Sequence, residues 1–261
     1  MQRALFTAAT GMAAQQLNVD VIANNLANVN TTGYKRSRVD FEDLLYQIIQ
    51  APGTEAASGV EVPNGLQVGL GVRAAAIQKN FSQGIFKLTE NSLDLVIEGE
   101  GFFQITRPNG DANYTRDGAF RIDSAGQIVT ADGFLLEPAI TVPTDTTEIT
   151  VGVDGTMSVL QGGDTIPSVI GQIQTAQFPN EKGLLARGKN LFAETTASGS
   201  PTTGVPGENG LGTIQSGYLE GSNVQVVDEL VNLIIAQRAF EANSNAIQSS
   251  NQMLQLVNNL A

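Results

Sequence analysis

Both ends of the chain carry apolar residues that recur every seven positions, and this repeat restricts each end to a long helix. In the N-terminal segment the repeat consists of two sets of positions that are three residues apart. The sets are Leu5, Met12, Val19 and Leu26, and Ala8, Gln15, Ile22 and Val29. This spacing places both sets along one side of a helix, as in the seam of a coiled coil. We expect the helix to end near Thr31-Thr32-Gly33, with glycine as its left-handed terminator.

The C-terminal segment repeats the pattern. The two sets are Val226, Leu233, Phe240, Ile247, Leu254 and Ala261, and Ala236, Asn243, Ser250 and Val257, with Ala239, Ala246, Met253 and Leu260 widening the stripe. Ser222 or Asn223 is the expected N-cap. A helix over residues 224–261 would be ~57 Å long, whereas a compact chain of this length would be about 47 Å across. The helix is therefore expected to protrude.

Charge is missing from both ends. Residues 4–34 contain one charged side chain, Asp20, and residues 242–261 contain none. The positions outside the seam are Asn, Gln, Ser, Thr and Ala, which cost less to bury than charges if they find hydrogen-bond partners. We therefore expect these helices to be surrounded by helices of other copies, with the asparagines of residues 23–36 fixing the register between subunits. The alternatives are amphipathic helices on a globular core and a polar, solvated helical hairpin.

The composition excludes most catalytic and metal chemistry. The chain of 261 residues has no cysteine and no histidine, so it lacks a thiol nucleophile, a Ser-His-Asp triad and the usual zinc ligands. The net charge of −12 argues against nucleic acid or an anionic membrane as the main partner. We expect no enzymatic activity, no cofactor and no bound metal. We also expect no membrane insertion, because even the uncharged run 242–261 is rich in amides.

The middle of the chain predicts two further regions. Residues 35–90 with 196–221 are expected to form an extended connecting arm, and residues 91–195 a β-rich outer domain. Within the arm, residues 38–50 predict a short strand or helix, and the Gly- and Pro-rich residues 51–71 a linker or an extended ribbon against a partner. Residues 1–34 with 222–261 complete the division as a helical coiled-coil domain. The fold class is α+β, with paired long terminal helices, extended arms and an inserted all-β domain.

The outer domain alternates apolar and polar residues over 91–160, and a further strand is expected at 169–178. Tight turns are expected at Asn109-Gly110-Asp111, Ser124-Ala125-Gly126 and Asp154-Gly155.

Several motifs imitate binding sites. Residues 183–190, GLLARGKN, match most of a P-loop, but the final position is Asn190 and no long helix follows; GLGVRA at 69–74 imitates a dinucleotide fingerprint without a βαβ context. Both are interpreted as chance matches. Four aspartates, Asp111, Asp117, Asp123 and Asp132, are interpreted as turn residues rather than calcium ligands. The cluster of Lys35, Arg36 and Arg38 predicts either a solvated turn or a salt-bridge site for a neighbouring subunit.

Longer motifs carry a family resemblance. IANNLANVNTTGYKR (22–36) and the segment 216–254, which begins SGYLEGSNVQ, resemble the N- and C-terminal signatures of bacterial flagellar axial proteins, the family of basal-body rod and hook subunits. NGLQVGLGV (64–72), LDLVIEGEGFFQI (93–105) and YTRDGAF (114–120) are more similar to distal rod than to hook subunits. The resemblance is collinear over essentially the whole chain.

The resemblance implies a structural subunit that self-assembles into the distal rod, a rigid tubular helical drive shaft that transmits torque to the hook. Both terminal helices would pack in an inner tube, and a segment around 46–71 would keep the shaft straight. The implied partners are other copies, proximal rod proteins, the hook, the P- and L-rings and the flagellar export apparatus. The implied location is the periplasm-spanning rod of the basal body, reached without a cleaved signal peptide.

Alternatives remain at this point: a hook or proximal rod subunit, a secreted stalked adhesive or binding module, and a carboxylate-based hydrolase. The residues predicted to form the oligomer interface are Leu5, Met12, Val19, Ile22, Asn25, Leu26, Asn28, Val29, Lys35, Arg36, Leu230, Leu233, Phe240, Asn243, Ile247, Leu254 and Val257.

Overall fold

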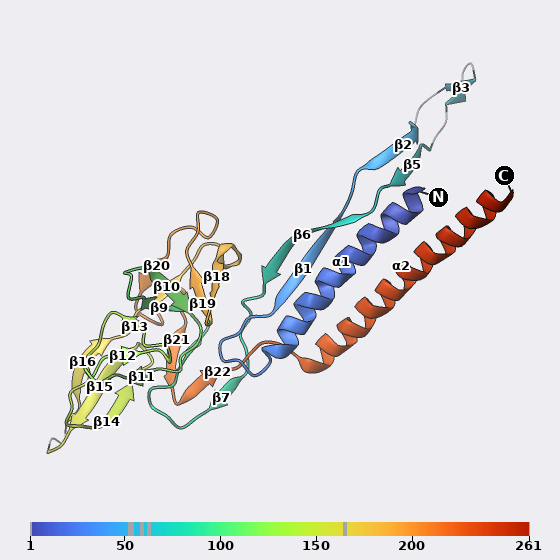
Figure 1. The fold of residues 1–261 in the computed structure, drawn as a ribbon. Helices are drawn as coiled ribbons and strands as arrows, with labels where there is room; N and C mark the ends of the chain where they lie inside the picture. The colour runs from blue at the N-terminus through green and yellow to red at the C-terminus, as the bar shows by residue number, and fades with distance from the viewer. Residues whose placement is uncertain (1, 52–54, 58–59, 62–63, 164–165, 261) are drawn as a thin grey trace. The chain divides into compact units, whose positions relative to one another are not determined.

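The structure is a computed structural model that describes residues 2–260 except 52–54, 58–59, 62–63 and 164–165. Helices at both ends and many strands between them make an α+β fold (Figure 1). The chain divides into two compact units, which are described separately. The helical unit comprises residues 1–27, 37–79 and 225–261, and the β unit comprises residues 28–36 and 80–224. Residues 37–79, assigned to a connecting arm from the sequence, thus belong to the same unit as both helices.

The helical unit contains two helices and a long hairpin. Its elements are α1 (Gln2–Ala27), β1 (Ser37–Asp43), β2 (Tyr46–Gln50), β3 (Glu55–Ala57), β4 (Val60–Glu61), β5 (Leu66–Gly69), β6 (Val72–Lys79) and α2 (Val226–Leu260). Helices α1 and α2 pack side by side (Figure 1). Strand β1 pairs antiparallel with β6, and β2 continues the hairpin by pairing antiparallel with β5. Residues 38–50 are therefore two strands, and the ribbon expected near 51–71 pairs within its own chain.

The β unit holds the remaining strands. These are β7 (Phe86–Leu88), β8 (Leu95–Glu98), β9 (Phe102–Thr106), β10 (Ala112–Thr115), β11 (Arg121–Ile122), β12 (Ile128–Val129), β13 (Leu135–Glu137), β14 (Thr146–Val151), β15 (Thr156–Gln161), β16 (Ser168–Gln172), β17 (Thr175–Gln177), β18 (Leu185–Gly188), β19 (Leu191–Ala193), β20 (Thr202–Gly204), β21 (Thr213–Ser216) and β22 (Tyr218–Glu220), with a short 3-10 helix at Glu181–Gly183. The strand expected at 169–178 is thus two strands, β16 and β17.

Strand β9 organises the largest sheet. The sheet runs β11-β12-β13-β9-β10-β19-β18, and β17 pairs with both β9 and β20. Strands β14, β15 and β16 form a three-stranded sheet, while β8 pairs with β21 and β7 with β22. The three turns expected from sequence connect β9 to β10, β11 to β12 and β14 to β15, and each contains a glycine with positive φ: Gly110, Gly126 and Gly155. Those turn predictions are confirmed.

Two apolar clusters stabilise the β unit. The larger is built mainly of aliphatic residues and includes Phe103 and Phe120, whose rings meet edge to face at 5.1 Å. The smaller is aromatic and centres on Phe102, which is fully buried. The ring of Phe102 meets those of Phe81, Phe178 and Phe192 edge to face at centroid distances of 5.5, 5.9 and 6.0 Å. Such pairs add to the free energy gained from burial.

Both helix boundaries differ from the sequence prediction. Helix α1 ends at Ala27, before Thr31, because residues 28–33 form turns in which the Thr31 N–H donates to the Asn28 carbonyl at 3.1 Å. Gly33 has a φ of +65°, as expected of a terminator, but it ends this turn segment instead of the helix. Helix α2 begins at Val226.

The Asn223 side chain does not cap α2. Its oxygen accepts from the Arg36 N–H at 2.7 Å and its nitrogen donates to the carbonyls of Asn80 and Ser82 at 2.8 and 3.0 Å. The capping prediction for Asn223 is therefore wrong, because this amide joins three segments of the β unit.

We predict that Phe102→Ala lowers the free energy of unfolding of the β unit by about 3–5 kcal/mol, because it leaves a cavity among three aromatic rings. Denaturant unfolding of the full chain, followed by a probe in the β unit, measures this. Ile166→Ala, at a side chain that is 78% exposed, is the matched control and should change stability by less than about 0.5 kcal/mol. Equal losses in the two variants would contradict the packing argument.

Candidate subunit interface

Several of the predicted heptad positions on α1 and α2 are buried or half-buried within the chain. On α2, Ala236 and Ser250 are 1% and 4% exposed, while Leu233, Asn243 and Ile247 are half-buried. On α1, Ala8 and Ile22 are buried. The two helices approach closely where Gly11 faces α2, since a Cβ at that position would lie 2.9 Å from the Asn243 Nδ2 atom. Part of the seam read from the sequence is thus covered within the chain, whereas Phe240 and Leu254 of the same seam are exposed.

The predicted interface residues fall into three groups. Ile22, Asn25 and Lys35 are buried within the chain. The half-buried residues are Leu5, Met12, Val19, Leu26, Asn28, Val29, Arg36, Leu233, Asn243 and Ile247. Leu230, Phe240 and Leu254 are exposed, and the side chain of Val257 lies outside the described part of the structure.

The Asn25 side chain makes hydrogen bonds within its own chain. The side chain is 1% exposed; its Nδ2 donates to the Ser37 carbonyl at 2.8 Å and its Oδ1 accepts from the Ser37 N–H at 2.9 Å. This reciprocal pair joins α1 to the start of β1. For Asn25, the expectation that the asparagines pair amides between subunits is therefore wrong, because both hydrogen-bonding ends of its amide are occupied by one backbone unit.

Helix α1 also has a second neighbour within the chain. It packs against β1 and β6, and the Thr10 hydroxyl accepts from the Val72 N–H at 3.4 Å. Ala14 and Val21 are buried, although neither belongs to the heptad seam. The argument that only other copies could surround the helices is therefore wrong for α1: its own hairpin covers a second face.

A second apolar stripe runs along α2 and is exposed. Val227, Leu230, Val231 and Ile234 are 72%, 44%, 50% and 57% exposed. Their i, i+3, i+4, i+7 spacing places them on one side of the helix, roughly opposite the buried Ala236. Of the four, the predicted interface included only Leu230. The i, i+3, i+4, i+7 spacing of these four residues is visible in the sequence. Because the neighbouring seam residues are also apolar, the sequence did not show that α2 carries this stripe in addition to the seam.

The ribbon of β2 and β5 is exposed in the same way. Tyr46, Ile48 and Ile49 are 53%, 59% and 54% exposed, and Leu45 before them is 85% exposed. Tyr46 and Ile48 are two residues apart on β2 and so lie on the same face of the ribbon, while Ile49 lies where the register with β5 shifts. Contiguous exposed apolar surface of this kind marks an interaction site.

The positive cluster of residues 35–38 has three different environments. Lys35 is 1% exposed, and its Nζ lies 2.7 Å from Glu220 Oε1 and 2.8 Å from the Ser82 carbonyl oxygen, to which it donates. The solvated-turn interpretation is therefore wrong for Lys35, and its charge partner belongs to its own chain. Arg38 lies on β1 with an exposed pair to Asp40 at 3.0 Å, and Arg36 is half-buried.

Glu220 is the centre of a buried charge cluster. Its Oε1 also accepts from the Gly84 N–H at 2.8 Å, its Oε2 lies 3.6 Å from Arg116 Nη1, and its carbonyl accepts from the Gly33 N–H at 2.8 Å. Arg116 is 3% exposed. Burial lowers the pKa of Lys35 below its ordinary value, and the Glu220 carboxylate opposes this shift. The cluster thus joins residues 33–35, 84, 116 and 220 by interactions that carry a desolvation cost.

In the structure, the P-loop-like and dinucleotide-like motifs found in the sequence are chance matches. Residues 183–190 run from the 3-10 helix through β18 into a turn before β19, and residues 69–74 lie between β5 and β6, so neither opens a helix as phosphate binding requires. The four aspartates serve turns and surface pairs; Asp123, for example, accepts from the N–H groups of Ala125 and Gln127. Within the described residues, no three carboxylates lie close enough together to hold a metal ion.

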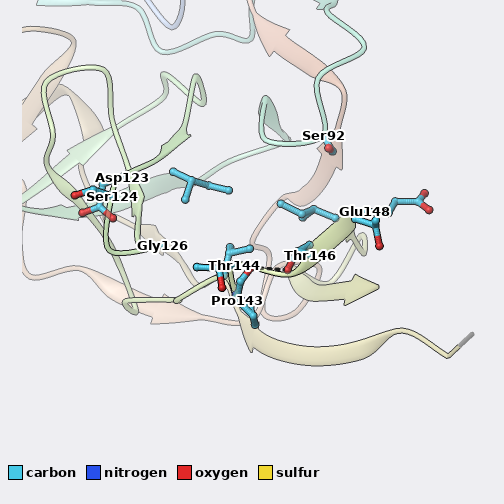
Figure 2. A pocket seen from close by; sticks show the side chains of 12 residues that line it. Ser92, Asp123, Ser124, Gly126, Pro143, Thr144, Thr146 and Glu148 are labelled. Carbon is cyan, nitrogen blue, oxygen red and sulfur yellow. Dashed lines mark hydrogen bonds between the residues drawn. The ribbon is translucent and has the colours of Figure 1, made fainter. Parts of the chain in front are cut away.

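The hollows of the β unit have mixed polar and apolar linings. Figure 2 shows one of about 430 Å³, in which Asp123 and Glu148 lie on opposite sides of a set of hydroxyl-bearing residues. Asp123 is already engaged by backbone N–H groups. The arrangement therefore offers no adjacent acid and base of the kind that a carboxylate-based hydrolase uses. Neither described helix combines the length and apolarity that a membrane span needs.

Taken together, terminal helices with an uncovered stripe and a bare β ribbon are typical of a subunit of a larger assembly. Family models agree. Residues 5–35 match "Flagella basal body rod protein", residues 96–159 match "Flagellar hook protein FlgE/F/G D1 domain", and residues 215–260 match "Flagellar basal body rod FlgEFG protein C-terminal".

Curated relatives match over the whole chain. The flagellar basal-body rod protein FlgG of Caulobacter vibrioides is 50% identical over 259 residues, covering 99% of both chains. FlgG of Borreliella burgdorferi is 48% identical, covering 100% of this chain and 99% of its own, and FlgG of Buchnera aphidicola from Acyrthosiphon pisum is 47% identical, covering 98% of both. The chain belongs to the FlgG family of flagellar basal-body rod proteins. The family resemblance seen in the sequence is confirmed.

We predict that Glu220→Gln lowers the free energy of unfolding of the β unit by about 3–5 kcal/mol, because it removes the carboxylate that pairs with the buried Lys35 and Arg116 cations. Asp132→Asn, which breaks the exposed pair of Asp132 with Lys189 in the same unit, is the control and should cost less than about 1 kcal/mol. Denaturant midpoints of the two full-length variants test this. If Glu220→Gln is no more harmful than the control, Glu220 does not hold the cluster together.

Proposed function

We propose that the protein is a structural subunit of the flagellar distal rod, and that its copies assemble into a rigid tubular helical polymer that transmits motor torque to the hook. A structural role without enzymatic activity follows from membership of the FlgG family. The observation that carries the assembly proposal is the exposed stripe Val227, Leu230, Val231 and Ile234 on α2. A side of a helix with four adjacent apolar side chains that are 44–72% exposed gains free energy when another subunit covers it.

Three further features support packing between copies. The remaining exposed face of α1 carries Ala9, Ala13 and Ala23, whose small side chains allow a neighbouring helix to approach. Within the described residues of α1, the charged side chains are Arg3 and Asp20, both of which are exposed. The ribbon of β2 and β5 adds exposed apolar side chains, among them Tyr46, Ile48 and Leu66. We propose that α1 and α2 form a coiled-coil layer with the helices of other copies, and that the ribbon lies between neighbouring subunits and stiffens the shaft.

A helical polymer would cover these exposed apolar surfaces. When the contact between two copies joins different patches and the rotation between them does not close a ring, repetition of that contact generates a filament. Each subunit then buries its stripe against the next, and torque is carried by many interfaces in parallel. Within the filament, the half-buried interface residues Leu5, Met12, Leu233 and Ile247 would complete their burial, as would the exposed Phe240.

The family also suggests the neighbours of the polymer. We propose contacts with proximal rod proteins, the hook, and the P- and L-rings, and passage through the flagellar export apparatus without a cleaved signal peptide to a rod that spans the periplasm. A hook-type or proximal rod role is the second candidate, because one matching family model is described as a hook-protein D1 domain. The level of identity to several FlgG proteins favours the distal rod.

We predict that the purified full-length chain forms tubes with a regular lattice above a critical concentration. Electron microscopy across a concentration series, with sedimentation of the same samples, measures this. A discrete dimer or trimer at every concentration would contradict the polymer and favour a stalked binding module.

We predict that Val227→Lys raises the critical concentration for tube formation at least about 10-fold, because a lysine side chain in the covered stripe must lose water or stay outside the contact. Val153→Lys is the matched control: Val153 is 66% exposed, close to the 72% of Val227, but it lies in the β unit. Both variants should unfold like the unmodified chain. If the two variants assemble alike, the stripe on α2 is not a contact between subunits.

A further inference from the structure

The hollow drawn in Figure 2, of about 430 Å³, lies in the β unit and carries charges of one sign. Among the described residues that line it, the charged ones are Asp123 and Glu148, and the aliphatic ones include Ile122, Val142 and Ile149. A lysine or arginine side chain fits such a lining, because its carbon stem packs on apolar groups while its charged end pairs with a carboxylate. The lining therefore favours a basic side chain over an anion.

Both carboxylates keep an oxygen available to a group that arrives from solvent. Glu148 is exposed on β14, and its side chain takes part in no ion pair or hydrogen bond among the described residues. Asp123 is half-buried in the turn between β11 and β12, where its Oδ1 accepts from the N–H groups of Ala125 and Gln127, both at 2.8 Å. These two bonds hold the Asp123 carboxylate in place, while its Oδ2 has no donor among the described residues. A cation entering the hollow thus meets two negative groups that no cation yet neutralises.

The part of the chain around the hollow supplies no cation of its own. Residues 122–181 contain eight Asp and Glu side chains and no Lys or Arg. Arg121 precedes this stretch on β11, but it does not belong to the lining. A basic occupant therefore comes from elsewhere in the chain or from a second copy.

Three basic side chains gather at the opposite end of the largest sheet. The path of strands in this sheet begins with β11, next to the hollow, and ends with β18, along which lie Lys182, Arg187 and Lys189. Lys189 already pairs with Asp132 at 3.0 Å, and Lys182 follows Glu181 directly in the sequence. Arg187 is exposed, and its charge has no counterion within the described part of the chain.

Arg187 also has a distinct backbone position. In the pairing of β18 with β19, Ala186 lies opposite Phe192 and Gly188 lies opposite Leu191, so Arg187 is an extra residue at a β-bulge. A bulge near the edge of a sheet re-aims a side chain out of the regular strand. Leu185, in the same strand, is 51% exposed. The β18 edge thus presents a guanidinium without a counterion close to an exposed aliphatic side chain.

We propose that Arg187 of one copy enters this hollow in a second copy, where its guanidinium pairs with the Glu148 carboxylate and its stem packs against Ile122 and Ile149. Asp123 adds a second negative group to the same hollow. Charge complementarity selects a second copy as the occupant, because β18 offers a cation without a counterion and the hollow offers carboxylates without a cation. The proposal rests on the proposed function, in which copies assemble, and it adds an ionic contact between β units to the apolar contacts of the helical unit.

The positions of the two surfaces allow the contact to repeat. They lie at the two ends of one path of strands, so the contact joins different patches of the two copies. Each copy then gives one Arg187 and offers one hollow. A contact of this kind generates a filament when the rotation between copies does not close a ring.

Charge reversal on either side of the contact tests the proposal. Arg187→Glu and Glu148→Arg, each in the full-length chain, should raise the critical concentration for tube formation at least about 10-fold, because each brings like charges together. The chain with both substitutions should assemble like the unmodified chain, and so should an equal mixture of the two single variants, because opposite charges then meet again. Lys87→Glu and Glu208→Arg change the net charge by the same amounts at exposed positions of the β unit and should assemble normally. All variants should unfold like the unmodified chain, since the substituted side chains are exposed.

The outcomes separate this proposal from the rod function. If the unmodified chain forms no tubes in the electron microscope, the proposed function is rejected, and this inference with it. If tubes form and both single variants assemble like the unmodified chain, only this inference is rejected. Impairment by Glu148→Arg alone would show that the hollow takes a different basic group, and impairment by both without recovery in the double variant would place the residues in separate contacts. Either result would overturn the pairing of Arg187 with Glu148.

Discussion

Two helices and one hairpin cannot cover all the apolar side chains that the helical unit carries, and this constraint explains most of its features. Pairing of α1 with α2 buries one face of each helix, and the β1–β6 hairpin buries a second face of α1. Among the described residues, helix α2 packs mainly against α1, and Val227, Leu230, Val231 and Ile234 stay exposed. The remaining polar positions are amides, hydroxyls and alanines, which tolerate later burial. A surface of this composition is unstable in isolation and is satisfied by association.

The β unit, in contrast, buries the residues of its two apolar clusters within the chain. In the aromatic cluster around Phe102, the rings pack edge to face. Next to this cluster, Lys35 and Arg116 are buried with Glu220, which also accepts from the Gly84 N–H. A buried ion cluster contributes little net stability but tolerates few alternative arrangements, because losing one partner strands the others. Glu220 is thereby tied to segments that lie 185 and 136 residues away in sequence. Lys35 and Gly84, which lie near the start of the β unit in sequence, are thereby held next to Glu220, which lies near its end.

Periodicity and composition determined a large part of this protein. The heptad sets located both helices, and the absence of charge over residues 4–34 and 242–261 indicated that the helices are not simply solvated. Alternation and glycine turns located most strands of the β unit. The long terminal motifs identified the family. All of these signals come from residues that are close together in the sequence, so they can be recognised without the tertiary structure.

Only the tertiary structure decided which polar groups are used within the chain. Asn25 and Asn223 read as interface or cap residues, but Asn25 bonds to Ser37 and Asn223 bonds to Arg36 and to the segment of Asn80 and Ser82. Lys35 sits in a run of positive charge that looks solvated, yet its partner Glu220 is 185 residues away. Ala14 and Val21 lie outside the seam and are buried by the hairpin. A hydrogen bond or ion pair between distant segments leaves no periodic trace, because its formation depends on where the chain returns and not on what precedes it.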